Sequence, residues 1–164
     1  MTLTTHVSVG MAVGTIVGNP VAGFFVGLAS HHICDLIPHS DPGSRGATVD
    51  NIFDRKNRGS LVWVIGDVIV AATIFLAVFL LTGNKSAIFW SVFGATISDF
   101  IDNSPLWSQW LRERFPVKQF HAFHEKVHFT IKSKKYFWVG ILTQAVLIIL
   151  SFSLIGYSIL DTVY

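Results

Sequence analysis

Charged residues are scarce in this sequence. Asp, Glu, Lys and Arg together make up 13% of its 164 residues, whereas 51% are hydrophobic. Soluble domains average about 25% charged residues, so this composition predicts an integral membrane protein. The formal net charge of +2 is also too small to indicate a nucleic-acid-binding surface, and we expect no nucleic-acid partner.

Cysteine is almost absent. The single Cys34 excludes an intramolecular disulfide and a cysteine-based zinc cluster. It lies inside an apolar run, so we interpret it as a packed thiol. The first residues also lack the basic segment of a secretory signal, and we expect the first apolar stretch to remain in the mature protein.

Five apolar stretches account for most of the chain, at residues 7–17, 21–37, 61–82, 86–101 and 136–160. The third and the fifth are long enough to cross about 30 Å of hydrocarbon unaided. Backbone groups in lipid must be satisfied within each segment, which favours helices, and the runs do not alternate as barrel strands do. We therefore expect an all-α fold, a polytopic membrane helical bundle of about five transmembrane or partly inserted helices, in one domain covering residues 1–164.

A turn-forming triplet, Gly18-Asn19-Pro20, interrupts the first apolar region. It favours two short helices joined by a tight hairpin over one span across residues 7–29, although one span would put His6 across the bilayer from the other histidines. Basic residues gather in loops at about 39–60 and 103–135, which the positive-inside rule assigns to the cytoplasm. The expected location is the inner (plasma) membrane of the cell, in a multi-pass arrangement.

All seven histidines lie on the cytoplasmic side under the hairpin topology. His31 and Asp35 are separated by four residues, so on a helix they share one face at a spacing suited to one ion. Pro38 ends that helix and directs His39 back toward it. His32 is offset by about 100° and need not belong to the same site. A hydrogen-bonded His31–Asp35 pair that ties two helices together is the alternative interpretation.

A second histidine stripe lies in the later cytoplasmic loop. His121, His124 and His128 follow one another at spacings of three and four, which again predicts a single helical face. Imidazole suits zinc and related transition metals. The alternative is an amphipathic helix whose histidines contact anionic lipid headgroups.

Three carboxylates interrupt apolar helices. Asp67 stands alone, whereas Asp99 and Asp102 are one turn apart. Ionisable groups in such helices are costly, so they indicate a functional site. Asp99 and Asp102 could supply oxygen ligands or orient a ligating imidazole, and for Asp102 a solvated helix end is equally compatible with the sequence.

These short motifs together resemble a known family. They are Thr5-His6, Ser30-His31 with Asp35 and Pro38-His39, Ser98-Asp99, and the His124/His128 pair. The pattern is similar to that of the membrane-bound metal-dependent hydrolases, a bacterial inner-membrane family described as distantly similar to zinc-dependent phospholipase C. The resemblance implies a phosphoester or related hydrolase with matched ligand candidates at His6, His31, Asp35, Asp99, His124 and His128. Phospholipase C proteins are secreted and soluble, however, so no specific substrate is carried over.

The leading hypothesis is an enzyme that holds a divalent metal, with zinc the expected ion, at the cytoplasmic membrane face. Its predicted metal ligands are His6, His31, Asp35, His39, Asp99, His121, His124 and His128. Asp99 or Asp67 would act as general base in metal-assisted hydrolysis of a phosphoester or lipid-type substrate. The expected partners are membrane lipids and a small-molecule or lipid substrate.

Three other classes stay open from the sequence. An ion or metal transporter would use Asp67 and Asp99 to line a pathway, although the polar groups crowd one end of the helices and no repeat is visible. A non-catalytic membrane adaptor would hold anionic lipid or a partner through Lys132, Lys134 and Lys135. A haem protein is conceivable from the paired histidines, but carboxylates beside them suit a harder ion better.

Overall fold

The computed structural model describes residues 1–161, and this part of the chain is helical, as the sequence predicts. No β-strand occurs within it, apart from one isolated bridge between His39 and Thr130. The α-helices are α1 (Leu3–Val17), α2 (Pro20–Leu36), α3 (Arg58–Leu81), α4 (Lys85–Asp102), α5 (Ser108–Arg112), α6 (Val117–Val127) and α7 (Phe137–Asp161). Short 3-10 helices lie at Pro42–Arg45, Val49–Asn51, Arg55–Asn57 and Lys134–Tyr136.

The predicted hairpin between the first two helices is confirmed. Helix α1 ends at Val17, and Gly18 adopts a left-handed φ of 66°, which glycine reaches without a steric penalty. Asn19 then caps α2 by accepting a hydrogen bond of 3.0 Å from the Ala22 N–H. Pro20 occupies the first turn of α2, where its missing N–H is not needed. One continuous helix across residues 7–29 is therefore wrong.

Helix α4 packs closely against α1 and α2 through small residues. A Cβ atom on Gly14 would come within 2.6 Å of the Ile88 Cα, so α1 and α4 meet almost backbone to backbone. Gly27 makes the same kind of approach to Ser91, and Gly94 to Phe24, between α2 and α4. Small residues allow such contacts in membrane helix pairs. This packing fixes how the ends of the three helices sit relative to one another.

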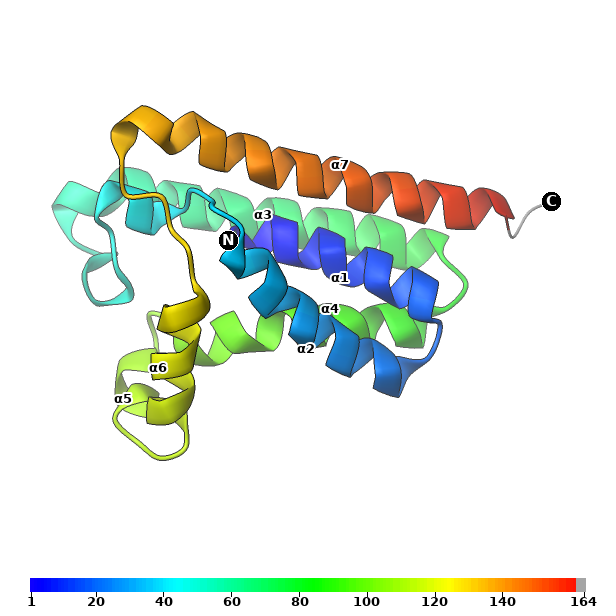
Figure 1. The fold of residues 1–164 in the computed structure, drawn as a ribbon, viewed down its shortest axis with the longest axis horizontal. Helices are drawn as coiled ribbons and strands as arrows, with labels where there is room; N and C mark the ends of the chain where they lie inside the picture. The colour runs from blue at the N-terminus through cyan, green and yellow to red at the C-terminus, as the bar shows by residue number, and fades with distance from the viewer. Residues whose placement is uncertain (162–164) are drawn as a thin grey trace.

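The antiparallel helices gather distant segments at one end of the bundle. Figure 1 shows which elements lie toward the left: the N-terminus, the C-terminal ends of α2 and α4, helices α5 and α6, and the start of α7. The α1–α2 turn, the α3–α4 connection and the far end of α7 lie toward the right. We call the left end the histidine end, because every histidine belongs to an element that reaches it.

Two helical segments in the described part of the chain, Arg55–Leu81 and Lys134–Leu160, are long and apolar enough to cross a membrane. Only 11% and 22% of their most apolar windows are buried inside the protein, which is unlike the core helices of soluble folds. Helices α1, α2 and α4 are shorter, with 15, 17 and 18 residues. Insertion of all five apolar segments stays a prediction.

The close approach of α2 to α4 makes Gly27 sensitive to substitution. We expect Gly27→Ala to lower the free energy of unfolding by about 1–3 kcal/mol, because the new methyl group meets the Ser91 backbone. Gly66→Ala is the matched control, since a Cβ atom there has nothing within 4 Å. Thermal unfolding in detergent micelles measures both, and equal midpoints for the two variants would contradict the packing described.

Candidate metal centre

Asp35 lies at the centre of a buried cluster of imidazoles. It is in the last turn of α2 and is fully buried. Its Oδ2 atom is 3.3 Å from the Nε2 atoms of both His31 and His124. Its Oδ1 atom is 3.3 Å from the Nε2 atom of His6 and 2.5 Å from the amino nitrogen of Met1. Histidines from three helices therefore converge on one carboxylate.

Asp99 completes this arrangement from α4. Its Oδ1 atom is 3.9 Å from His31 Nε2 and 3.8 Å from His124 Nε2, and its Oδ2 atom is 3.7 Å from His6 Nε2. One ligand atom from each of His31, Asp35, Asp99 and His124 lies within 4.8 Å of all the others, so these residues could hold a metal ion. We call these four residues and His6 the Asp35–Asp99 centre.

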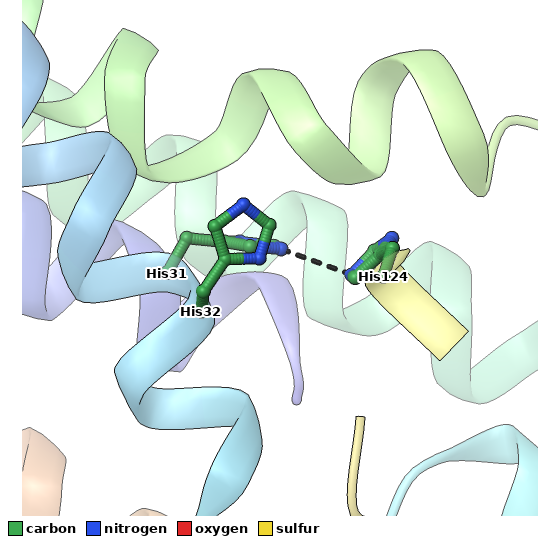
Figure 2. A group of neighbouring side chains, drawn as sticks. All are labelled: His31, His32 and His124. Atoms are coloured by element: carbon green, nitrogen blue, oxygen red, sulfur yellow. Dashed lines mark hydrogen bonds between the residues drawn. The ribbon is translucent and has the colours of Figure 1, made fainter. Parts of the chain in front are cut away.

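The imidazoles of the centre are held by their other nitrogen atoms. His31 Nδ1 donates a hydrogen bond of 2.9 Å to the Ala95 carbonyl of α4. That bond places the proton on Nδ1 and leaves the Nε2 lone pair facing Asp35. Figure 2 shows His31 and His32 reaching from α2 toward His124 of α6, and the Nε2 atoms of His31 and His124 are 3.2 Å apart. A hydrogen-bonded partner on the outer nitrogen is typical of metal-ligating histidine.

Asp102 orients His124 instead of facing solvent. It is fully buried, and its Oδ2 atom accepts a hydrogen bond of 2.9 Å from His124 Nδ1. The same carboxylate accepts from His121 Nδ1 and from Arg112 Nε, each at 3.0 Å. Of the three roles that the sequence allowed for Asp102, namely oxygen ligand, orienting residue and solvated helix end, its burial and its bond to His124 Nδ1 fit the orienting one. His121, predicted as a ligand, is placed against Asp102 and is not among the groups whose ligand atoms converge.

A second group lies beside Asp35. The ligand atoms of Asp35, His39 and His128 are within 4.8 Å of one another. Asp41 adds a carboxylate, with its Oδ2 atom 3.3 Å from His39 Nε2 and 3.9 Å from His128 Nε2. Asp41 was not predicted as a site residue, although it follows His39 by only two positions. His32, which helical spacing did not require at the His31–Asp35 site, joins His31 and His124 in a further possible group.

Asp67 lies apart from these groups, at the N-terminus of α1. Its Oδ2 and Oδ1 atoms accept hydrogen bonds from the backbone N–H groups of Leu3, at 2.6 Å, and Thr4, at 3.0 Å. The first N–H groups of a helix have no partner within it, and a carboxylate there also offsets the positive end of the helix dipole. The Asp67 carboxylate of α3 thus caps the first turn of α1, and it is not among the groups whose ligand atoms converge, while its role as general base stays a prediction.

Three ring nitrogen atoms of two fully buried histidines lack hydrogen-bond partners in the described structure. These are both ring nitrogens of His6 and the Nε2 atom of His39, and both side chains are fully buried. A buried polar atom without a partner is unfavourable by about 1–3 kcal/mol and needs an explanation. A cation bound to the Nε2 atom of either histidine and to the carboxylates beside it would satisfy that Nε2 atom, so the donor set fits a metal ion.

The surroundings shift the pKa values of two site histidines in opposite directions. Burial lowers the pKa of His124, but hydrogen bonds to Asp102 and Asp35 raise it more, to about 9. Burial and the nearby terminal ammonium group lower the pKa of His128 to about 4. Without metal at neutral pH, His124 is therefore protonated and His128 is neutral.

Comparison with known proteins gives no further guide to this site: no protein-family model, no curated protein and no solved structure matches the chain.

The raised pKa of His124 predicts proton release on metal binding. A metal ligand must be deprotonated, so at pH 7 His124 has to lose about one proton for each ion bound. We expect that contribution to vanish above pH 9, and His128 to contribute none above pH 5. Calorimetry with Zn²⁺ in buffers of different ionisation enthalpy counts the protons, and Glu125→Gln is the control. The same count at pH 7 and pH 10 would contradict this assignment.

The bond between Asp102 and His124 predicts an effect on metal affinity. Asp102→Asn removes the charge that orients His124, and we expect it to weaken metal binding by about 10- to 100-fold. Asp50→Asn is the matched control, because Asp50 is exposed and accepts a hydrogen bond of 2.9 Å from Gln109, away from the centre. Competition with a chromophoric chelator measures both variants, and equal affinities would show that Asp102 does not support the centre.

Proposed function

We propose that this protein is a membrane-bound metal-dependent hydrolase with a divalent ion, most suitably zinc, in the Asp35–Asp99 centre. The observation that carries the proposal is the spacing of the ligand atoms. Four tetrahedral zinc ligands at 2.0–2.1 Å from the metal stand about 3.3–3.4 Å from one another. The contacts of His31 Nε2 with His124 Nε2 and Asp35 Oδ2 are 3.2 and 3.3 Å.

The donor types support a catalytic metal of this kind. Imidazole with carboxylate suits zinc and related ions, whereas calcium and magnesium prefer oxygen alone. The side chain of Asp99 is 19% exposed, while those of His31 and Asp35 are 0% exposed. Water and substrate would therefore reach the centre past Asp99, and catalytic zinc sites keep such an open position.

The residues around the centre would divide the work of hydrolysis. When bound, a divalent ion lowers the pKa of water toward neutrality and polarises a phosphoryl or acyl oxygen. Asp99, at the open side, is suited to accept a proton as general base. Asp102 keeps His124 oriented through its bond to Nδ1. Fully buried His31 and Asp35 hold the opposite side away from water.

The surface near the centre favours a lipid-type substrate at the cytoplasmic membrane face. The segment around α5 exposes large apolar side chains, including Leu106 at 76%, Trp110 at 54% and Phe115 at 83%. The Arg114 guanidinium lies 3.5 Å from the centre of the Trp110 ring. Arginine stacked on tryptophan beside exposed apolar groups is typical of elements in the headgroup layer. With two candidate spans and basic loops, this supports a multi-pass protein of the inner (plasma) membrane.

Metal analysis together with a hydrolysis assay tests the proposal. We expect detergent-purified protein to contain stoichiometric metal and to hydrolyse a phosphodiester, with bis-p-nitrophenyl phosphate and a short-chain phospholipid as probes. His31→Ala, Asp35→Asn and His124→Ala should lose the metal and the turnover together, because each removes a ligand atom from the centre.

Asp54→Asn is the control for these variants, since its side chain is 53% exposed and pairs with Lys56. It should retain both metal and turnover. Protein without metal, or unchanged metal content in all three ligand variants, would overturn the metal site. Stoichiometric metal with no turnover on either probe would overturn the hydrolase assignment alone.

A further inference from the structure

A cleft at the start of α7 lies outside the Asp35–Asp99 centre. Its volume is about 450 Å³, and it is lined by Ser44, Arg45, Lys134, Phe137 and Trp138. Two of these residues are cationic and two are aromatic, whereas none is acidic. The first two belong to the 3-10 helix Pro42–Arg45, and the other three belong to the start of α7 and the 3-10 helix before it. We call this the Arg45 cleft.

Arg45 is oriented by aromatic rings and has no anionic partner. Its guanidinium carbon lies 5.1 Å from the centre of the Trp63 ring and 5.2 Å from the centre of the Phe137 ring. Such cation–π contacts hold the face of the group and leave the N–H donors at its edge available. Within residues 1–161, neither Arg45 nor Lys134 forms a side-chain hydrogen bond or an ion pair, whereas Arg112 pairs with Asp102. The cleft therefore holds two uncompensated positive charges.

Ser44 and the start of α7 add further donors. Ser44 is 9% exposed, and its Oγ atom accepts a hydrogen bond of 3.2 Å from the Asp41 N–H. The hydroxyl proton of Ser44 has no acceptor in the described part of the chain, so it can be donated into the cleft. Helix α7 has no acidic residue in its first turn to offset the positive end of its dipole. These groups together suit a phosphate.

The two walls of the Arg45 cleft are held together independently of any ligand. Ser40 Oγ donates a hydrogen bond of 2.8 Å to the Phe137 carbonyl. A Cβ atom on Gly140 would lie 2.5 Å from the Ser40 nitrogen, so the loop packs directly on the backbone of α7. The cationic groups on the two walls are thus placed before a ligand arrives, which lowers the entropic cost of binding.

The cleft lies where both candidate membrane spans begin. The segment Lys134–Leu160 starts in the cleft, and Trp63 lies near the start of the segment Arg55–Leu81. Figure 1 shows that α3 and α7 both start at the histidine end. Beyond the cleft, α7 exposes Trp138 at 74% and Leu142 at 63%. Cationic and aromatic residues at the end of an apolar helix are typical of the headgroup layer.

We propose that the Arg45 cleft binds the phosphate group of an anionic phospholipid, which is held there as a bound lipid and not as a substrate. Arg45 and Lys134 bind the phosphate oxygens, and Ser44 donates a hydrogen bond to them. The acyl chains lie along the exposed apolar side of α7, which is the reason for a lipid rather than free phosphate. The inference is independent of the proposed function, because no residue of the cleft belongs to the metal centre.

Native mass spectrometry of the detergent-purified protein tests this site. We expect one dioleoylphosphatidylglycerol to bind about 10-fold more tightly than dioleoylphosphatidylcholine, whose choline group brings a positive charge to the cleft. Arg45→Gln and Lys134→Gln should each weaken phosphatidylglycerol binding by about 5- to 10-fold. Equal affinities for the two lipids, or unchanged affinity in both variants, would overturn the site.

Two matched controls separate the cleft from general surface charge. Lys85→Gln removes a cation that also lies over an aromatic ring, 5.9 Å from the centre of Phe79, at the far end of α3. Lys126→Gln removes an exposed cation at the histidine end, outside the cleft. Both should bind phosphatidylglycerol as the unmodified protein does. A loss in Lys126→Gln equal to that in Arg45→Gln would overturn the cleft as the binding site.

Two further measurements identify the source of the phosphate and the place of the lipid. Glycerol phosphate at the same concentration should not displace phosphatidylglycerol, and full displacement would overturn the assignment to a lipid. His124→Ala should retain the lipid, because His124 is remote from the lining residues of the cleft in the set of metal ligands. Loss of the lipid in that variant would mean a substrate at the Asp35–Asp99 centre and would overturn the inference. Arg45→Gln should keep its metal, so the two proposals can fail separately.

Discussion

The structure depends on the burial of one carboxylate, Asp35, among imidazoles from several elements. An ionised carboxylate away from water is strongly unfavourable unless charges or hydrogen-bond donors surround it. Here His6, His31 and His124 all lie 3.3 Å from it. These contacts join α1, α2 and α6. The bundle must therefore place the three helices so that their histidines reach Asp35.

The helix packing achieves this placement through small residues. Glycines at 14, 27 and 94 bring α4 against α1 and α2 with little space for a side chain. An approach this close leaves few ways to slide one helix along another. The helix ends are thereby held at fixed positions along the bundle axis, and the ligands that they carry stay at the same depth. The glycine contacts that pack the apolar part of the bundle therefore also position the ligands at the histidine end.

Much of the fold was predictable because its signals are local. The Gly18-Asn19-Pro20 turn follows from backbone preferences alone, and the shared face of His31 and Asp35 follows from helical spacing. Asp41 was not found because its role depends on Thr130, which is distant in the sequence and reaches it only through the bridge at His39. The capping role of Asp67 could not be predicted either, since no local pattern shows that it meets the first turn of α1.

The support of the loop that carries His39 has a consequence for the order in which the protein matures. Ser40 Oγ donates to the Phe137 carbonyl at 2.8 Å, and Gln144 Nε2 donates to the Ser40 carbonyl at 2.7 Å. Both partners belong to α7, which is synthesised after the other six α-helices of the described residues. The ligands of the Asp35–Asp99 centre are all synthesised before it, up to His124. A nascent chain can thus bring the ligands of the Asp35–Asp99 centre together before α7 is made, whereas the loop that carries His39 is held in place only after α7 docks.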